Sequence, residues 1–527
     1  GAAGLTVAGD ISSTTAGTSN FRAGVNAGDS IASGGNYNVC VGDEAGTAIT
    51  TGDDNVAVGY NALDANLTGT QNIAVGYQAL SANTTANSNI AVGTNALAAN
   101  TTGALNTAVG ENVMNANIEG ANNVALGYAA LDADTYGNQS TALGYGTLTA
   151  QNFTSSTSSQ NTAIGYNAGA AVTTGINNTL LGSSAGDALT DADHNVAVGY
   201  DTLGADTLGK QSTALGRRAL AAQNFTSATA SQNVAVGFYA GKYVTTGINN
   251  TLIGAHAGDA LTDADNNVAV GYQALSTDTL GSRSTALGRF ALYTQNSTSA
   301  TNSNNVGVGY YAGKAVTTGV NNTLLGTVAH DNLTTGDLNI SVGYNNGPSA
   351  VDVDSEIVIG NSVTGAGTNT VRIGTAAGTA TLGLDGSDTS WAAASDSRLK
   401  KDVTDSTAGL EFINDLRPIT FKWNAKNEVA EDLPQHDADS SDPIFGEGKA
   451  HHGFIAQEVK AVIDDHSDVL DGNNIWHEDP DGTQQLSQGN LVPMLVKAVQ
   501  ELSAKTEELR STIAELEAKP QCKCNGE

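Results

Sequence analysis

The stretch Asn55-Val56-Ala57-Val58-Gly59 decides the fold, because closely similar phrases return along most of the chain, as in Asn72-Ile73-Ala74-Val75-Gly76. Apolar residues flank a small alanine at alternate positions, which is typical of a short, half-buried β-strand, and the glycine closes the phrase at a turn. A short strand that recurs at a fixed period predicts a repeat architecture in which each rung stacks on the next.

The closing glycines set the length of a rung. They fall 17 residues apart from Gly42 to Gly144, and steps of 21 residues then occur at Gly165, Gly237 and Gly309. Three steps of 17 and one of 21 make a 72-residue super-repeat, which indicates duplication of a four-rung block. We expect each rung to read strand, turn, strand, turn, and about twenty rungs to stack at about 4.8 Å each.

A rung of this length is too thin to bury both of its faces. The inward residues are mostly Ala, Val, Leu and Ile, so an apolar face remains that packs most simply against two further copies about a three-fold axis. The predicted fold class is therefore mainly β, a trimeric parallel β-roll or β-solenoid, followed by a small α+β domain that ends in a coiled-coil helix.

Composition and charge exclude several functions. The 527 residues include 62 Gly but only 7 Pro and 5% aromatic residues, and the net charge is −31. Nucleic acid is therefore excluded as a partner, because phosphate binding needs a basic surface. No apolar run approaches the roughly 18 residues of a membrane span. The chain begins at Gly1 without a signal peptide, so we expect a piece upstream.

Charge also marks a boundary, because residues 395–527 carry 13 of the 22 Lys and Arg. We divide the chain into a β lead-in and attachment segment at 1–19, the β-roll at 20–375, a β linker at 376–394, and a globular module at 395–527. Within this module, residues 491–519 are expected to form a coiled coil, with apolar residues at heptad spacing. One heptad position holds Val492, Val499, Thr506 and Ile513, and the other holds Leu495, Leu502, Leu509 and Leu516. β-Branched residues at the first heptad position with leucine at the second would, by themselves, favour a coiled coil of two helices.

Two resemblances add to this pattern. The phrases over residues 72–80 and 195–200 resemble the head repeats of trimeric autotransporter adhesins and of tail-fibre proteins, which implies a left-handed parallel roll of three chains. Residues 395–400, 416–423 and 453–459, followed by the terminal helix, resemble the intramolecular chaperone of phage endosialidases and tailspikes.

The second resemblance implies a domain that trimerises the chains, templates the fibre and then cuts itself off as a serine peptidase. By motif position, Ser395 is the nucleophile, Lys400 is its base, and the bond between Ala394 and Ser395 is cut. A lysine acts as a base only when its pKa is lowered, and Arg398 and Lys401 could supply the positive charge.

Other roles stay open for the residues of this module. Ser395 could instead cap a helix, with Lys400 a surface residue. His451, His452 and Glu458 are candidates either for supporting the dyad or for packing.

Other candidate sites lie on the repeats. A row of tyrosines that follow closing glycines could face a receptor and stack on sugars, or could simply cover the rung edges. These receptor-facing candidates are Tyr60, Tyr77, Tyr128, Tyr200 and Tyr272. Acidic turns at 187–193 and 259–265 bring carboxylates together as Ca²⁺ requires, although a solvated turn is the favoured interpretation because no full ligand set is visible. No other cofactor and no metal ligand set is assigned.

Three cysteines, Cys40, Cys522 and Cys524, rule out a wholly intrachain disulfide framework. An interchain bridge and unpaired thiols remain as alternatives at the C-terminal pair.

The leading hypothesis is an extracellular homotrimeric fibre, most simply a virion tail fibre that binds a host-surface receptor, such as a glycan. Its N-terminal end would attach to a virion or cell-surface protein, and its chemistry would be limited to one self-cleavage. The alternative is a bacterial cell-surface or appendage adhesin. A polysaccharide-degrading tailspike is a third hypothesis, but it needs paired carboxylates in a cleft, and the insertions here add only four residues.

Overall fold

The computed structural model describes residues 15–384, 392–393, 397, 400–431, 433, 436–444, 448–467, 469, 475–479 and 482–519. The chain forms two compact units, residues 1–394 and residues 395–527. The lead-in phrase expected at residues 4–11 lies outside the described residues.

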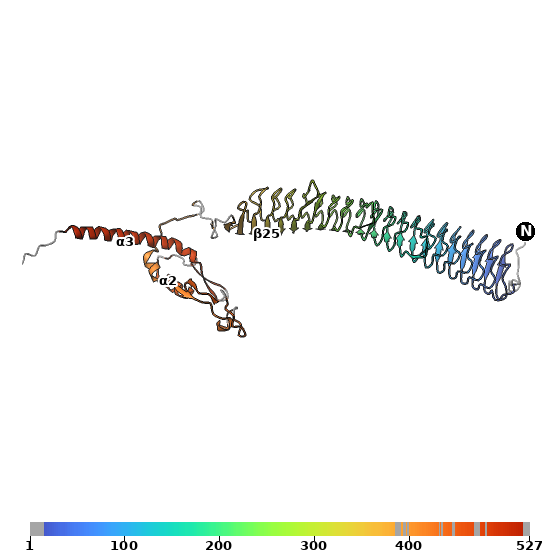
Figure 1. The fold of residues 1–527 in the computed structure, drawn as a ribbon, viewed down its shortest axis with the longest axis horizontal. Coiled ribbons are helices and arrows are strands. Elements are labelled where there is room, and N and C mark those ends of the chain that lie inside the picture. Colours follow the sequence, from blue (N-terminus) through green and yellow to red (C-terminus); the bar gives the residue numbers. More distant parts are fainter. Residues whose placement is uncertain are drawn as a thin grey trace, which may run out of the picture. The chain divides into compact units, whose positions relative to one another are not determined.

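The first unit is a parallel β-solenoid of about 21 turns (Figure 1), which confirms the predicted repeat architecture. One strand from each rung joins a single 23-stranded sheet, and from β1 to β27 each strand pairs in parallel with the next, as Val56 of β3 does with Ile73 of β4. The strands are β1 Phe21–Ala23, β2 Val39–Val41, β3 Val56–Val58, β4 Ile73–Val75, β5 Ile90–Val92, β6 Thr107–Val109, β7 Val124–Leu126, β9 Thr141–Leu143, β11 Thr162–Ile164, β12 Thr179–Leu181, β13 Val196–Val198, β15 Thr213–Leu215, β17 Val234–Val236, β18 Thr251–Ile253, β19 Val268–Val270, β21 Thr285–Leu287, β23 Val306–Val308, β24 Thr323–Leu325, β25 Ile340–Tyr344, β26 Ile357–Asn361, β27 Thr370–Thr375, β28 Gly378–Gly383 and β29 Ala392–Ala393.

The expectation of two strands in every rung is wrong for most of the 17-residue rungs, where the structure describes one strand of three to five residues. The rest of the rung is interrupted by residues with left-handed backbone, such as Asn61 and Leu63. These residues break the extended conformation that a second strand needs. Backbone hydrogen bonds still join adjacent rungs there, as from Leu63 N–H to the Ala79 carbonyl at 3.0 Å.

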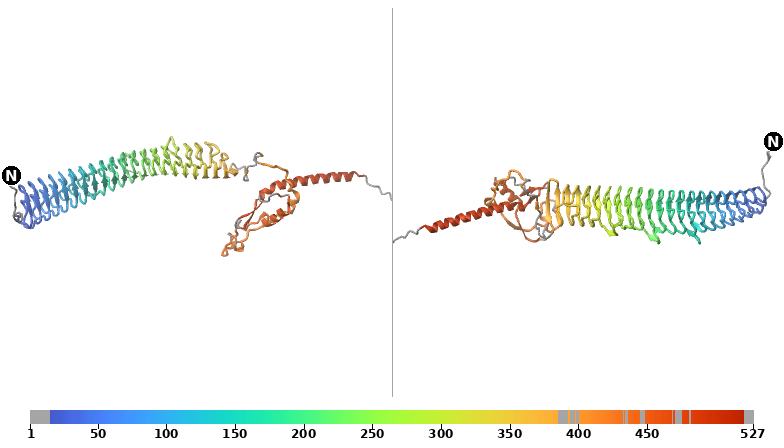
Figure 2. Two further views of the ribbon diagram at one scale, coloured as in Figure 1. Left: turned by 180° about the vertical axis from the view of Figure 1, so that it is seen from behind. Right: turned by 90° about the horizontal axis from the view of Figure 1, so that it is seen from above.

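A second strand forms only in the 21-residue rungs and the rungs that precede them. The four extra residues let a two-residue strand pair with the preceding rung, and these insertions project from one edge of the solenoid (Figure 2, right). The pairs are β8 Gly137–Asn138 with β10 Thr157–Ser158, β14 Gly209–Lys210 with β16 Thr229–Ala230, and β20 Gly281–Ser282 with β22 Thr301–Asn302.

The closing glycine of each rung is required by close backbone stacking. Gly199 has a φ of 135°, and a Cβ atom built on it would lie 2.7 Å from the carbonyl oxygen of Gly216, the equivalent glycine of the next rung. Side chains are therefore excluded from this corner of every rung. This explains why glycine recurs at the end of the phrase.

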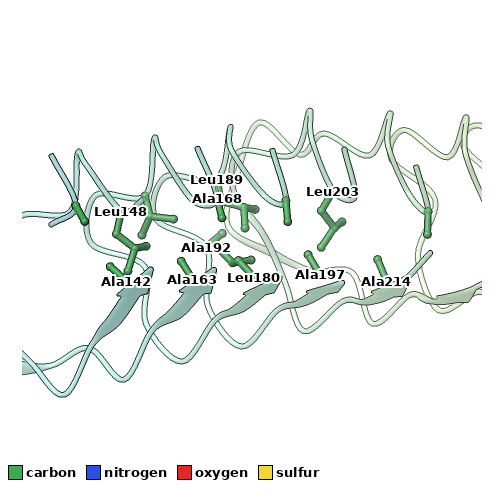
Figure 3. Close-up of a cluster of buried hydrophobic side chains, with 14 of the residues drawn as sticks. Ala142, Leu148, Ala163, Ala168, Leu180, Leu189, Ala192, Ala197, Leu203 and Ala214 are labelled. Carbon is green, nitrogen blue, oxygen red and sulfur yellow. The ribbon is translucent and has the colours of Figure 1, made fainter. Parts of the chain in front are cut away.

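The core of the solenoid is a thin file of small and aliphatic side chains (Figure 3). The central strand residues Ala142, Ala163, Ala197 and Ala214 are fully buried and face residues such as Leu203 from the opposite wall. Each rung has room for about one large side chain. The strand alanine of a rung therefore packs against a leucine from the opposite wall. The predicted inward alanine of each phrase is confirmed.

One rung in each 72-residue block reverses this pairing. Leu180 replaces the strand alanine, and Gly169 and Gly186 stand where neighbouring rungs have leucine. A Cβ atom on Gly169 would lie 2.7 Å from Leu180 Cδ1, so the glycine provides the space that this leucine fills. The volume of the core is thus conserved between rungs.

A ladder of buried asparagines lines one inner corner. Asn195 accepts a hydrogen bond from Ser212 N–H at 2.9 Å and donates one to the Gly209 carbonyl at 2.9 Å. Its own N–H donates to Asn178 Oδ1 at 3.0 Å. Each asparagine therefore satisfies buried backbone groups of the following turn, where no strand supplies partners.

The outer face of the main sheet is apolar and open. The first and third residues of each strand point away from the core, and several of them are exposed by a third or more. These residues include Ile73, Val124, Leu126, Ile164, Ile253, Leu287, Ile340 and Val342.

The second unit is a small α+β module around its own core. Phe412 of α1 (Leu410–Asp415) packs with Val459 and Ile463 of α2 (Ala456–Asp465) and with Leu491. Two antiparallel pairs complete the unit, β30 (Ile419–Phe421) with β31 (His451–Gly453), and β32 (Trp476–Glu478) with β33 (Gln484–Leu486). Short 3₁₀ helices cover Lys426–Glu428 (η2) and Gln488–Leu491 (η5).

The long helix α3 (Val492–Ala518) contacts the rest of this unit only near its start (Figure 1). Ala498 is its one buried residue, and Glu501 accepts the Leu410 N–H at 2.8 Å, which lowers the pKa of the Glu501 carboxyl. From Leu502 to Ala518 every residue of the helix is exposed.

Replacing a ladder asparagine should destabilise the solenoid. In Asn195→Ala the Gly209 carbonyl and the Ser212 N–H lose their partners while buried. We expect the free energy of unfolding to fall by roughly 3 kcal/mol, measured by denaturant titration. Asn224→Ala is the control, because Asn224 is exposed and accepts only a surface hydrogen bond from Thr207. Equal losses in both variants would contradict a structural role for the ladder.

Acid should destabilise the solenoid through His330. This histidine is fully buried, at the position that Gly186 and Gly258 hold in the two preceding blocks, and neither ring nitrogen has a partner among the described residues. Burial lowers its pKa to about 4, opposed by the charge of Glu356. An unfolded histidine has a pKa of about 6.5 and binds the proton more tightly, so stability falls by roughly 3 kcal/mol as the pH drops from about 6.5 to about 4.

His330→Leu should remove this component of the pH dependence, measured by denaturant titration at a series of pH values between 7 and about 4. His194→Gln, at an exposed position, should keep it. An unchanged pH profile in His330→Leu would show that other groups cause the acid effect.

Candidate functional site

The motifs of the C-terminal module meet at one antiparallel pair. Residues 418–421 lie in one quoted motif, and residues 451–454 lead into another, which begins at Gly453. Strands β30 and β31 place them side by side, with Ile419 opposite Gly453 and Thr420 opposite His452. Arg417 forms an ion pair with Glu458 of α2, which joins the same two motifs a second time. This pair raises the pKa of the arginine and lowers that of the glutamate.

A cavity of about 250 Å³ lies at this junction. Gln488 of η5, just before α3, contributes to it together with both motifs, so the segment that leads into the terminal helix also reaches this junction. The residues that line it are Pro418, Ile419, Thr420, His452, Gly453, Phe454 and Gln488. Its size suits a short peptide segment or a side chain better than a large substrate.

The structure describes only part of the predicted dyad. Ser395 and Ala394 lie outside the described residues, as does Arg398. Lys400 is exposed, and its N–H donates to the Ser397 carbonyl at 3.2 Å. The assignment of Ser395 as nucleophile and Lys400 as base therefore stays a prediction.

The supporting candidates have distinct environments. His452 is exposed, and its Nδ1 lies 3.2 Å from Thr420 Oγ1 at the cavity. His451 Nε2 is buried and has no hydrogen-bond partner among the described residues. Glu458 is engaged by Arg417. His452 is thus the candidate that faces the cavity.

The tyrosines that follow closing glycines lie in one column along the solenoid. The backbone carbonyl of each of these tyrosines accepts a hydrogen bond from a backbone N–H of the next rung, as the Tyr60 carbonyl does from the Gln78 N–H at 3.0 Å. Tyr60 and Tyr77 stack with ring centroids 5.7 Å apart, and Tyr128 stacks on Tyr145 at 5.2 Å. About half of the side-chain surface of each predicted tyrosine, Tyr200 and Tyr272 included, is exposed.

The acidic turns do not gather their carboxylates. Asp191 accepts a hydrogen bond from Thr174, and Asp193 pairs with Lys210 at 2.6 Å. Asp259 pairs with His256 at 2.8 Å in the equivalent turn. Within the part of the chain that the structure describes, no group of three ligating side chains suits a metal ion.

Sequence reasoning missed the basic residues of the tyrosine column. Arg217 and Arg289 follow closing glycines just as the tyrosines do, and each lies over aromatic rings. Their position after Gly216 and Gly288 was the signal that could have identified them.

Two smaller findings concern the thiol and the membrane. Cys40 is a buried free thiol whose pKa is raised to about 11 by burial, so it is unreactive at neutral pH. Cys522 and Cys524 lie outside the described residues. Among the helices described, none has the length and apolar character needed to span a bilayer.

Comparison with known proteins identifies the C-terminal region. Residues 395–468 match the family model of the chaperone of endosialidase, a peptidase family. No curated protein and no solved structure matches the chain. The chain therefore joins a parallel β-solenoid to a region similar to the chaperone of endosialidase, the combination of a tail-fibre or endosialidase-type protein with a C-terminal chaperone.

Proposed function

We propose that this protein is a homotrimeric extracellular fibre, most simply a phage tail fibre that contacts the host surface, assembled by its C-terminal chaperone. The observation that carries the proposal is that each unit exposes an apolar surface. The match of residues 395–468 to the chaperone family supports it.

The helix α3 supplies the first surface. Its predicted heptad residues are exposed, with Leu509 at 63% and Leu516 at 58%. An isolated helix with an apolar stripe is only marginally stable in water, whereas the same stripe packed against copies of itself is buried. Further copies of this chain are therefore the partners that fit the stripe. The number three comes from the solenoid and the resemblance, because the heptad residues alone favour two helices.

The solenoid supplies the second surface. The third residue of every main-sheet strand from β2 to β24 is valine, leucine or isoleucine and points outward, whereas the first is threonine in eight of them. The result is a largely apolar face that three copies would bury together about one axis. Nearly identical rungs can slip by one repeat with little local penalty. A C-terminal clamp removes this ambiguity, because it aligns the three chains before the rungs pair.

Self-cleavage would follow assembly. With Ser395 as nucleophile and Lys400 as base, attack on the Ala394 carbonyl breaks its bond to the Ser395 nitrogen, and water then releases the Ala394 carboxyl group. Removal of the clamp leaves the fibre kinetically trapped, because the template for assembly is gone.

Charges placed in the α3 stripe should abolish trimer formation. In the full chain, Leu502→Asp with Leu509→Asp puts carboxylates where the copies meet. We expect monomers or aggregates in place of the three-chain species of the wild type, measured by native mass spectrometry. Glu508→Gln with Glu517→Gln, outside the stripe, should stay trimeric. A monomeric wild type, or trimers of the Asp variant in normal yield, would contradict the proposal.

Replacing either dyad residue should separate assembly from cleavage. Wild-type protein should yield a fragment that begins at Ser395, while Ser395→Ala and Lys400→Ala should remain full length and trimeric, since folding depends on the module's surface. Denaturing electrophoresis with intact mass measures this. Ser397→Ala is the matched control and should be cut. Cleavage of Ser395→Ala at the same bond would disprove the assigned nucleophile.

A further inference from the structure

Basic residues are concentrated in one part of the solenoid. Residues 1–394 contain nine Lys and Arg in a strongly acidic chain, and seven of these lie between residues 210 and 314: Lys210, Arg217, Arg218, Lys242, Arg283, Arg289 and Lys314. The two arginines of the aromatic column, Arg217 and Arg289, are both exposed.

Arg217 lies among three rings. Its guanidinium carbon is 5.8 Å from the ring centre of Tyr200, 5.7 Å from that of Phe238 and 5.5 Å from that of Tyr239. One nitrogen donates to the Tyr239 hydroxyl at 3.2 Å. Lys242 lies over the same Tyr239 at 4.7 Å. These groups form one cluster of two cations, two exposed rings and the half-buried ring of Tyr239.

The same cluster recurs 72 residues later. Arg289 lies 5.8 Å from the ring centres of Tyr272 and Tyr310 and 4.7 Å from that of Phe290. Lys314 lies over Tyr311 at 4.4 Å, as Lys242 does over Tyr239. Four rungs separate the two clusters, a distance of about 19 Å along the axis. One extended polymer can therefore reach both.

Neither arginine of these clusters has a carboxylate partner among the described residues. Neighbouring charged groups do have such partners, since Arg218 pairs with Asp201 at 2.7 Å and His256 with Asp259. A guanidinium carries five N–H donors. Among the described residues, Arg217 uses one nitrogen, which donates to the Tyr239 hydroxyl. The free donors point to an anionic ligand.

The first 72-residue block provides an internal comparison. There the column holds Tyr145 in the place of Arg217, with Asn167 and Ala170 in the places of Tyr239 and Lys242. Tyr145 stacks between Tyr128 and Tyr166 at 5.2 and 5.3 Å. The column is thus complete as a stack of rings without any cation. Rung packing therefore does not require the arginines of the later blocks.

We propose that the Arg217 and Arg289 clusters bind a carboxylated polysaccharide. Exposed aromatic faces stack on the apolar faces of sugar rings, and the guanidinium groups donate bidentate hydrogen bonds to the sugar carboxylates. Two clusters in each chain engage successive parts of one polymer, which multiplies a weak single contact. This inference gives a ligand class to the receptor contact proposed above, and it rests on that function for its biological meaning.

Binding to polygalacturonate tests the proposal, with its methyl-esterified form as the uncharged counterpart of the same sugar backbone. We expect the full chain to bind polygalacturonate in a salt-sensitive manner, and the ester at least about tenfold more weakly. Arg217→Gln with Arg289→Gln should lose at least about tenfold in affinity. Arg217→Tyr with Arg289→Tyr, which recreates the column of the first block, should lose as much.

Lys210→Gln with Arg283→Gln is the matched control, because it removes two cations from the same rungs outside the aromatic column, and it should bind within about twofold of wild type. The proposal is overturned if none of polygalacturonate, alginate and hyaluronan binds, or if Arg217→Gln with Arg289→Gln binds as well as the Lys210→Gln with Arg283→Gln control. It is also overturned if the Arg217 and Arg289 variants lose their trimer, because the clusters would then be contacts between copies. Native mass reports assembly separately, so failure of the trimer in wild type is distinguishable from failure of binding.

Discussion

The rest of the solenoid depends on the close approach of successive backbones at the closing glycine. At Gly199 and its equivalents, a side chain would collide with a carbonyl of an equivalent glycine. Because this corner admits only glycine, each rung is held in one register on its neighbour. The buried asparagine ladder then satisfies the polar backbone groups that the short strands leave unpaired. These two columns allow a rung of 17 residues to stack with almost no core.

A thin core has consequences for the surface. With mostly alanine, leucine and valine inside, each rung buries little apolar area, so much of the remaining apolar surface lies on the outer face of the sheet. In the second unit the helix α3 likewise leaves apolar side chains uncovered, because its heptad leucines are exposed. Both units therefore present surfaces that suit further copies of the chain, and this is the physical basis of the proposed fibre.

Duplication of the four-rung block allowed neighbouring surfaces to diverge on a constant frame. The block containing Tyr145 keeps a stack of rings, whereas its two copies carry Arg217 and Arg289 at the same place. Because the inner columns hold the rungs together, such outward positions can change without disturbing the fold. Ligand recognition can thus evolve separately from stability.

The amino-acid sequence by itself determined the parallel repeat, the 17-residue and 21-residue rungs and the inward alanines, because these follow from local periodicity and from the limits of backbone geometry. It also pointed to the chaperone region through motifs that lie in chain order. Only the tertiary structure decided that most of the 17-residue rungs have one strand, since left-handed residues such as Leu63 interrupt the second. Burial of His330 and the contact of Arg217 with rings from adjoining rungs likewise depend on which residues lie one rung apart, which requires the stacked coil in three dimensions.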